Sequence, residues 1–540
     1  MLSSIKSHIP GWSVFFQALI ALVVPILLYW LYKSLVSLAD DKLVSSGGAT
    51  SLNSSSDNAT PSDPITANYD ANMDNIRSTV GVNSDVVIRE LTMGNAKVRA
   101  ALIFVKGMQE DQVLKLGIMQ MLQDTEANLP LPIINRLPTS SAHATSSMEE
   151  LKKAILFGYL ALIIDGHNEG LLINPPSGPA RDITEPVSES LLRGSRIGFT
   201  EDINVNTAML RKQGVTENLQ IRSYTVGHTI QKELAIVYLD QIVNPDLLKE
   251  VNDRIEKVKL DFAAESGYIE QLIEDNYLSP FQQIQNTERP DRVIAALLEG
   301  RIAILLDGTP FALIVPVTFS MLLQSPEDYF ERWLPGSLLR MLRFLAAFIA
   351  VMAPSLYISF ISFHPGLIPT ELALTIIETR QNVPFPALIE VMILEISIEL
   401  LREAGIRLPK PIGPAMGIVG GLVIGEAAVQ AGIVSPFLVI VVAVTAISSF
   451  SIPVYSAGIT LRLLRFVAML FASILGMFGT ILFFLLICSH LSKLKSFGVP
   501  YLTPLSPYRW SDWKDFFLRV PIFLMKRRPK LMKTIQNKRR

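Results

Sequence analysis

GPAMGIVGGLVIGEAAVQAG, residues Gly413–Gly432, contains no basic residue and one acid, Glu426. Glycine recurs along it at every fourth position, at Gly413, Gly417, Gly421 and Gly425. This spacing places the four glycines on nearly one stripe of a helix. In water the stripe would only weaken the helix, but in lipid it lets helix backbones approach closely. The stretch therefore predicts a membrane helix that packs tightly against others.

Composition indicates a chain that is part membrane protein and part water-soluble protein. The mean hydropathy is +0.36, and 18% of the 540 residues are charged. A chain with these values is too apolar to be a fully soluble protein and too polar to be a bundle of membrane helices alone. The apolar stretches gather in the last third, and Pro453 is expected to kink the fourth of them. The predicted spans are Leu338–Phe363, Phe385–Leu401, Ile412–Ala431, Pro436–Ile459 and Leu463–Cys488.

Another hydrophobic segment lies near the N-terminus. Val14–Tyr32 contains no charged residue and is long enough to span a bilayer. No small-residue cleavage site follows it, so a retained anchor is favoured over a signal peptide. Leu43–Thr66 is rich in Ser, Gly, Asn and Thr and is expected to form a flexible tether.

The residues between the tether and the spans contain an internal repeat. Gly158–Gly166 (GYLALIIDG) and Gly300–Gly308 (GRIAILLDG) share one pattern, and a helix-like run precedes each. Upstream, Ala100–Lys106 and Leu234–Asp240 are matching β-rich runs. A segment of helical periodicity follows each of these runs, namely Asp111–Leu122 and Asn244–Val258. The sequence therefore predicts two related subdomains, each with a strand, two helices and a second strand.

Two features of this region have a functional and a structural interpretation. Asp165–Gly166 and Asp307–Gly308 end the repeated runs and are expected to be turns into second strands rather than a binding site. Gly194–Asp202, together with Arg181, Arg193 and Arg196, forms a loop rich in Gly and Arg. The strand, glycine loop and Lys-Ser/Thr spacing of phosphate-binding loops does not accompany it, so a structural loop is favoured.

These features give a fold class and a division of the chain. We expect an α+β cytoplasmic region of two related α/β subdomains, then an all-α polytopic membrane domain, with an extra N-terminal membrane anchor. The expected segments are the anchor (1–42), the tether (43–66), soluble subdomain 1 (67–185), soluble subdomain 2 (186–336), the multi-pass domain (337–492) and an amphipathic, basic C-terminal tail (493–540).

Polar side chains inside the predicted spans are the candidate functional residues, because charges are costly in hydrocarbon and usually face a protein interior or a watery path. For the second span an ion pair within or between helices is favoured, among Glu390, Glu395, Glu399 and Arg402. Glu426 either contacts a pore or is hydrogen-bonded between helices. In a symmetric oligomer a ring of such carboxylates would favour cations. The candidate pore or helix-packing residues are Gly413, Gly417, Gly421, Val423, Gly425, Glu426 and Gln430.

The distribution of Lys and Arg predicts orientation. If five spans alternate, the basic groups before the first, after the second and before the fifth span all face the cytoplasm. The soluble body is then cytoplasmic, but an odd number of spans sends the tail Lys526–Arg540 to the opposite face. That tail carries eight Lys/Arg and no acid, which is typical of a cytoplasmic segment near anionic lipid. A re-entrant span, or an extra pass at Phe311–Leu323 or Tyr501–Leu524, would remove the conflict.

Signatures of catalysis are scarce. The chain has six His, and none stands in an HExxH pattern; GxSxG, Walker and GxGxxG patterns do not occur either. The single Cys488 excludes an intrachain disulfide. A net charge of −1 gives no case for nucleic acid. We expect no enzymatic activity, no catalytic residue, no cofactor, no metal site and no nucleic-acid partner.

The sequence resembles the A subunits of GerA-type spore-germinant receptors of endospore-forming bacteria. The match runs from about Val86 to Arg465, in long co-linear blocks that are highly specific. The resembling blocks are GFTEDINVN (Gly198–Asn206), TERPD (Thr287–Asp291), LLEGRIAILLDGTPFALIVPVTF (Leu297–Phe319), SPEDYFERW (Ser325–Trp333), FHPGLIPTELALTI (Phe363–Ile376), REAGIRLPKPIG (Arg402–Gly413) and IVGGLVIGEAAVQAGIVSP (Ile418–Pro436). The N-terminal anchor and tether look like additions to the common pattern.

The resemblance implies a multi-pass protein of the spore inner membrane. It implies two partners, a permease-like B subunit that senses the nutrient and a lipoprotein C subunit. It also implies that A subunits form a homo-oligomer in the lipid bilayer, a nutrient-gated cation channel whose opening starts germination. A secondary transporter and a non-conducting scaffold for the permease-like partner stay open as alternatives. The transporter usually carries repeats in its membrane half, whereas this chain repeats in the soluble half.

Overall fold

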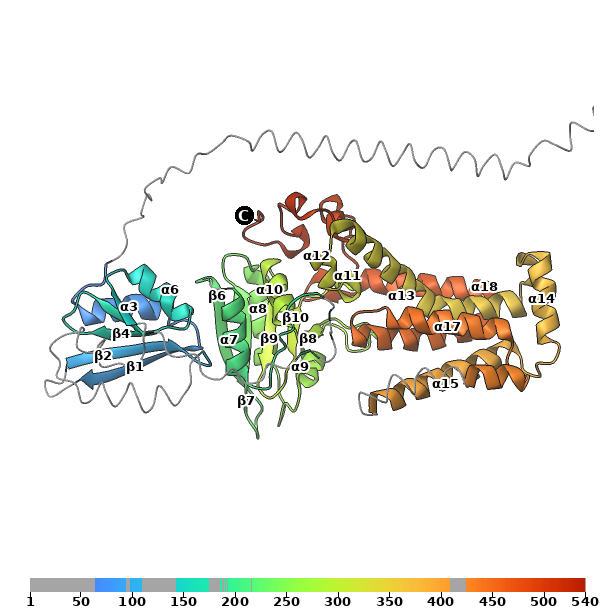
Figure 1. The fold of residues 1–540 in the computed structure, drawn as a ribbon, viewed down its shortest axis with the longest axis horizontal. Coiled ribbons are helices and arrows are strands. Elements are labelled where there is room, and N and C mark those ends of the chain that lie inside the picture. Colours follow the sequence, from blue (N-terminus) through green and yellow to red (C-terminus); the bar gives the residue numbers. More distant parts are fainter. Residues whose placement is uncertain are drawn as a thin grey trace, which may run out of the picture. The chain divides into compact units, whose positions relative to one another are not determined.

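The computed structural model describes residues 64–539, apart from 94–97, 109–141, 174–184, 187, 188, 190, 192, 215 and 408–423 (Figure 1). The predicted anchor Val14–Tyr32 and nearly all of the predicted tether lie outside the described residues. The described chain is α+β, with two five-stranded sheets followed by a helical region.

The first subdomain is an antiparallel sheet with two helices on one face. Its strands lie in the order β1-β2-β4-β5-β3. Side chains alternate between the faces of β2, so Ala101, Ile103 and Val105 pack in one cluster with the residues of α3 and α6. The described elements are α3 (Tyr69–Thr79), β1 (Val86–Met93), β2 (Val98–Val105), β3 (Ala142–Thr145), α6 (Met148–Leu156), β4 (Leu160–Ile164) and β5 (Gly170–Ile173).

The second subdomain has the same strand order, β6-β7-β9-β10-β8, again fully antiparallel, with helices on both faces. Val251 of α8 and Ile269 of α9 belong to the core on one face. Leu210 of α7 and Val293 of α10 belong to the core on the other. The elements are α7 (Ile203–Gln213), β6 (Leu219–Val226), β7 (Lys232–Leu239), α8 (Pro245–Glu256), α9 (Ser266–Ile273), β8 (Gln285–Thr287), α10 (Pro290–Leu298), β9 (Ile302–Leu306) and β10 (Ala312–Val315).

The two matching sheets confirm the internal repeat. The repeated runs form β4 and β9, each preceded by a helix and joined by a hairpin to the next strand. Gly166 and Gly308 adopt φ values of +81° and +83°, a left-handed conformation that glycine tolerates, so the Asp-Gly pairs are turns as predicted. Of the helical segments predicted after the first strands, Asn244–Val258 is confirmed as α8, and Asp111–Leu122 lies outside the described residues.

A second repeated motif escaped the sequence analysis. It occurs as ITANYDAN (Ile65–Asn72) and FTEDINVN (Phe199–Asn206). In each copy the backbone N–H of the Thr donates to the side-chain oxygen of the last Asn. Asn72 donates to the Thr66 carbonyl oxygen at 2.6 Å, and Asn206 donates to that of Thr200 at 2.6 Å. Within each of these Thr–Asn clamps lies the residue that caps the following helix. The side-chain oxygen of Asn68 accepts from the Ala71 N–H, and that of Asp202 accepts from the Asn204 N–H. The predicted structural loop Gly194–Asp202 therefore ends in a helix cap.

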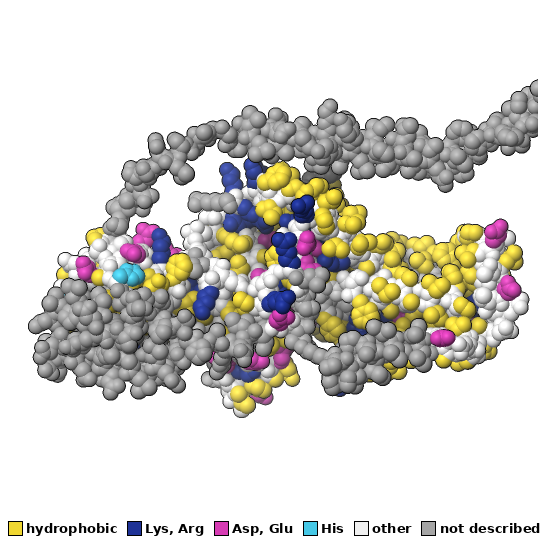
Figure 2. All heavy atoms as spheres, viewed as in Figure 1, with side chains coloured by type: hydrophobic (Ala, Val, Ile, Leu, Met, Phe, Trp, Pro, Cys, Tyr) yellow, Lys and Arg dark blue, Asp and Glu magenta, His cyan; other side chains and the backbone are white. Residues whose placement is uncertain are grey.

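The helical region begins directly after the second sheet. Its described helices are α11 (Phe319–Leu323), α12 (Glu327–Phe330), α13 (Trp333–Ser362), the short η2 (Pro365–Leu367), α14 (Thr370–Arg380), α15 (Ala387–Arg407), α17 (Pro436–Phe450) and α18 (Tyr455–Lys493). Among these, α13 and α18 are long and apolar enough to cross a membrane, by length and composition. Apolar side chains cover much of the visible face of this region (Figure 2).

The helix α18 folds back on itself. Near its start, the Thr460 hydroxyl donates to the Pro280 carbonyl oxygen at 2.7 Å, and near its end His490 Nε2 lies 2.8 Å from Ser279 Oγ. A straight helix of 39 residues would be about 58 Å long, so its ends could not meet neighbouring residues. At the centre, Gly476 has φ +61° and ψ −139°, which is not helical. The structure therefore has two helical arms joined at Gly476.

Two expectations about the spans are corrected. Leu463–Cys488 was expected to be one span, but Gly476 divides it, because both ends of α18 contact subdomain 2. Pro436–Ile459 was expected to be a kinked helix. Instead α17 ends at Phe450 and α18 begins at Tyr455, with Pro453 in the break, because proline lacks the N–H that a continuous helix needs.

The C-terminal residues return to subdomain 2. Arg528 is buried and donates to the Leu298 carbonyl oxygen at 2.8 Å, and Ile535 N donates to Ile242 O at 3.2 Å. Arg528 and Ile535 of the basic end thus contact protein, while Lys526 and Arg527 are exposed. The tail elements are β11 (Lys495–Ser496), β12 (Val499–Pro500), η3 (Trp510–Asp515), η4 (Ile522–Leu524) and η5 (Lys530–Met532).

Replacing Gly476 with Ala is expected to destabilise the helical region by about 1–3 kcal/mol, because alanine is strained in this conformation. The added Cβ would also lie 2.8 Å from a ring carbon of Phe363. The measurement is the midpoint of thermal unfolding of the full-length protein in detergent. Gly366→Ala is the matched control, since a Cβ there meets open space. Equal midpoints for the two variants would contradict the turn at Gly476.

Candidate functional site

Charged side chains from two helices meet inside the helical region. Glu395 of α15 and Arg465 of α18 are both fully buried and lie 2.9 Å apart. Arg465 also donates to Glu399 at 2.9 Å, and Arg462 lies 3.3 Å from the other oxygen of Glu399. The cluster ties the first arm of α18 to α15, because a buried charge is tolerated only when it is paired.

Arg402 extends this cluster to a third helix. Its guanidinium lies 3.6 Å from Glu399 on the same helix and donates to Ser449 of α17 at 2.9 Å. It also lies over the ring of Phe450, 4.4 Å from the ring centre. The structure therefore contains ion pairs both within and between helices, the interpretation that the sequence favoured. The cluster also includes Arg462 and Arg465, the basic group before the fifth predicted span, which served above only to predict the orientation of the spans in the membrane.

Glu390 forms a separate site near the start of α15. Its carboxylate is fully buried, accepts from Arg380 of α14 at 2.6 Å and accepts from the backbone N–H of Ser435 at 3.2 Å. The Ser435 hydroxyl in turn lies 3.1 Å from the Tyr357 hydroxyl of α13. Of the three glutamates grouped by sequence, Glu390 thus fixes the start of α17, while the other two join α15 to α18.

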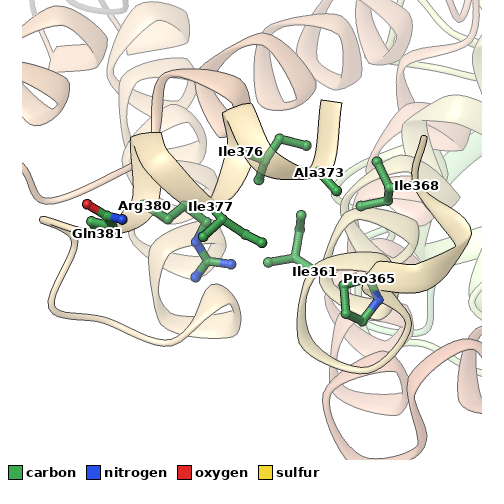
Figure 3. A pocket seen from close by; sticks show the side chains of 8 residues that line it. All are labelled: Ile361, Pro365, Ile368, Ala373, Ile376, Ile377, Arg380 and Gln381. Atoms are coloured by element: carbon green, nitrogen blue, oxygen red, sulfur yellow. The ribbon is translucent and has the colours of Figure 1, made fainter. Parts of the chain in front are cut away.

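A hollow of about 340 Å³ lies beside Arg380, between the end of α13, η2 and α14 (Figure 3). It is mostly apolar, with isoleucine side chains facing it from both sides. Arg380 is the charged residue of its lining and already pairs with Glu390. The lining residues are Ile361, Pro365, Ile368, Ala373, Ile376, Ile377, Arg380 and Gln381.

The candidate pore residues are only partly described. Gly413, Gly417, Gly421 and Val423 lie outside the described residues. Gly425 is buried, and a Cβ there would meet Val439 of α17 at 3.5 Å. One residue on, Glu426 is exposed, and its carboxylate accepts from Gln430 at 3.1 Å. Gly425 therefore packs inward on α17, and Glu426 points away from the protein core.

A junction that the sequence did not predict forms at Ser279–Gln283, the loop before β8. In addition to the contacts of Pro280 and Ser279, Gln282 accepts from Ser456 of α18, and its carbonyl oxygen accepts from the Tyr501 hydroxyl at 2.7 Å. Ser496 donates to the Gln283 carbonyl oxygen at 2.7 Å. One loop of the second subdomain thus holds both arms of α18 and the start of the tail. No local sequence pattern signals it, since its partners lie far along the chain, in α18 and beyond.

Glu270 of α9 lies directly behind this junction. Burial raises its pKa to about 7, the carboxylates of Glu274 and Glu265 add to the rise, and a hydrogen bond from Gln282 opposes it. Gln282 donates to Glu270 at 3.2 Å while accepting from Ser456. The carboxyl is therefore linked through one amide to the start of α18.

Comparison with known proteins supports the family resemblance. Residues 74–531 match the family model described as Bacillus/Clostridium GerA spore germination protein. The chain belongs to the GerA family. The resemblance drawn from the sequence is thereby confirmed, and membership supports a role in spore germination.

Individual relatives span most of this GerA-family chain. Spore germination protein GerLA of Bacillus cereus is 44% identical over 467 residues, covering 86% of this chain and 95% of the relative. The uncharacterized membrane protein YfkQ of Bacillus subtilis is 42% identical, with coverages of 86% and 91%. Spore germination protein B1 of Bacillus subtilis is 42% identical, with coverages of 86% and 97%.

A similar solved structure is the N-terminal domain of the A subunit of the Bacillus megaterium spore germinant receptor GerK3. It is 31% identical, covers 47% of this chain and 97% of its own, and gives a TM-score of 0.37.

Replacing Arg465 with Gln is expected to lower stability by about 3 kcal/mol or more, because it leaves buried Glu395 without its counter-charge. The double variant Glu395→Gln, Arg465→Gln should recover part of this loss. Arg407→Gln is the control, since Arg407 forms an exposed pair with Glu403 and such pairs contribute little. Thermal unfolding of the full chain in detergent measures these three variants and the single change Glu395→Gln. A double variant as unstable as the sum of its single changes would contradict a paired cluster.

Glu270→Gln is expected to flatten the pH dependence of stability. The folded-state pKa of about 7 lies above the ordinary value of 4.5, so between these pH values the folded state binds more protons, and stability falls as pH rises. The unfolding midpoint of the parent chain should therefore drop more between pH 5 and pH 8 than that of the variant, by several degrees. Glu256→Gln, an exposed change on α8, should follow the parent. Parallel curves for the parent and Glu270→Gln would overturn the assignment.

Proposed function

We propose that this protein is the membrane-embedded A subunit of a nutrient-responsive spore germination receptor. In this proposal A subunits oligomerise into a gated cation channel whose opening triggers germination. Family membership supports the role in germination. The observation that carries the channel is an outward-facing acid, Glu426, which directly follows the glycine stripe.

The membrane arrangement we propose has six passes. They are α13, α15, the stretch that includes Ile424–Gln430, α17, and the two arms of α18. Contacts at one end support this order, because Gly476 lies against Phe363 at the end of α13 and Glu390 reaches the start of α17. An even number of passes leaves the soluble subdomains and the tail on one side, proposed to be the cytoplasmic side of the spore inner membrane.

The exposed carboxylate supports the proposed oligomer. Charges are avoided at lipid-facing positions, so Glu426 is better accommodated against water or another subunit. In a closed ring one glutamate from each subunit would line the axis and favour cations over anions. The glycine stripe that precedes it, Gly413–Gly425, suits the close helix packing of such a ring.

The partners belong to the same proposal. The relatives include A subunits of germination receptors, which supports a permease-like B subunit as the nutrient sensor and a lipoprotein C subunit. The junction at Ser279–Gln283 offers a path between the soluble subdomains and α18. A non-conducting scaffold for the permease-like partner is the second candidate, favoured by the large share of the chain devoted to the two sheets.

Neutralising Glu426 tests the channel. In vesicles containing the reconstituted oligomer, Glu426→Gln should reduce the preference for cations over anions by about tenfold, as expected for the loss of a carboxylate ring. The readout is the reversal potential under a salt gradient. The matched control is Glu403→Gln, which neutralises an exposed acid of α15 that pairs with Arg407.

A scaffold predicts no conductance from either variant or from the parent. If the Glu426→Gln channel conducts with unchanged selectivity, Glu426 does not line the pore. Both results would contradict the proposed role, the first for the whole chain and the second for Glu426.

A further inference from the structure

The C-terminal tail runs beside the first turns of α13. Asp515 accepts from Arg340 at 2.7 Å, and Arg519 N donates to the Ser337 hydroxyl at 3.0 Å. The ring of Phe344 lies 5.3 Å from that of Phe516 and 4.6 Å from that of Phe517, between ring centres. The tail is therefore held level with residues 337–344, where the first predicted span begins.

The same part of the tail presents apolar side chains outward. We call Phe516–Met525 the interfacial segment. Within it, Leu518, Ile522 and Phe523 are 54%, 66% and 57% exposed. The first turns of α13 also carry exposed apolar residues, namely Leu334, Leu338, Met341, Leu342 and Leu345. Exposed apolar residues therefore occur both on the first turns of α13 and on the tail segment held beside them, and exposed apolar surface of this kind marks a binding face.

Basic side chains border the interfacial segment. Lys514 precedes it, and Lys526 and Arg527 follow it, all three exposed. From Arg509 to Arg540 the chain has eleven Lys/Arg and two Asp, and Asp515 is already paired with Arg340. Figure 2 shows apolar and basic side chains next to each other over the C-terminal part of the chain. Apolar residues flanked by Lys and Arg are typical of segments that lie in the interface of an anionic membrane.

We propose that the interfacial segment lies in the headgroup layer of the membrane leaflet that faces the soluble subdomains, bound to anionic lipid. Leu518, Ile522 and Phe523 enter the boundary of the acyl chains, and Lys514, Lys526 and Arg527 contact phosphate groups. This inference rests on the proposed membrane insertion of α13. It refines the sequence expectation for the tail, because an apolar segment meets the lipid together with Lys526 and Arg527, while Arg528 and Ile535 contact subdomain 2.

The lipid contact also has a mechanical consequence. Arg340 pairs with buried Asp328 and with partly exposed Asp515, and this group joins the tail to α12 and α13. A segment fixed both to lipid and to this group holds the base of α13 at a set depth in the membrane. The composition of the leaflet therefore acts on the position of α13.

Lipid-depth quenching tests the proposal in the full chain. Cys488 is the single cysteine, so Cys488→Ala gives a background for Phe523→Cys labelled with an environment-sensitive fluorophore. The protein is reconstituted in vesicles of phosphatidylcholine with or without phosphatidylglycerol, and brominated lipids serve as quenchers. Quenching at position 523 is expected to exceed that of a label at Ile230→Cys by about twofold or more, and to rise with phosphatidylglycerol. Ile230 is similarly exposed, 55%, in the turn between β6 and β7.

A third label, Leu345→Cys on α13, separates the two proposals. Quenching at 345 without quenching at 523 overturns the interfacial segment and leaves the membrane insertion of α13 intact. An absence of quenching at both positions overturns the insertion on which the inference rests. A label at 523 that shifts to the blue without quenching by lipid would identify a protein partner or a second copy, and would contradict the lipid assignment.

Discussion

The loop Ser279–Gln283 holds α18 near both of its ends and thereby sets the path of the chain through the helical region. It lies at the edge of the second sheet and forms hydrogen bonds with the start and the end of α18 and with the tail. Since one loop holds both ends of α18, the helix has to reverse, and Gly476 is the residue whose backbone permits this. The reversal then places the tail beside α13 and returns the chain terminus to subdomain 2.

The charged cluster has a complementary role. Glu395 and Glu399 tie α15 to the outgoing arm of α18 through Arg462 and Arg465, and Arg402 adds α17. Buried charges specify their partners, because a shifted packing would leave them unpaired at a cost of several kcal/mol. The cluster and the junction therefore position the same arm of α18 from two sides, one from within the helical region and one from the soluble sheet.

Much of the fold could be predicted from patterns that are local. The repeat GYLALIIDG and GRIAILLDG located two hairpins, and apolar runs located the long helices. The Thr–Asn clamp was missed because its two copies, ITANYDAN and FTEDINVN, are identical only at that Thr and that Asn. The reversal at Gly476 was missed because an apolar run indicates that a helix is buried in lipid or protein, but does not indicate where the helix changes direction. The partner of Glu395 could not be predicted because it lies on α18, and the spacing of residues within α15 does not show which helix packs against it.

The reversal of α18 and the even number of passes are tested by finding the side of the membrane on which three positions lie. Single cysteines at Ile230, Lys533 and Leu367 in the Cys488→Ala background report on subdomain 2, the tail and the far end of α13, and a membrane-impermeant maleimide measures their accessibility in sealed vesicles of known orientation. If α18 reverses at Gly476 and the number of passes is even, the cysteines at 230 and 533 react from the same side and the cysteine at 367 from the other. Reaction of 533 together with 367, and not with 230, would contradict the reversal of α18 and the even number of passes.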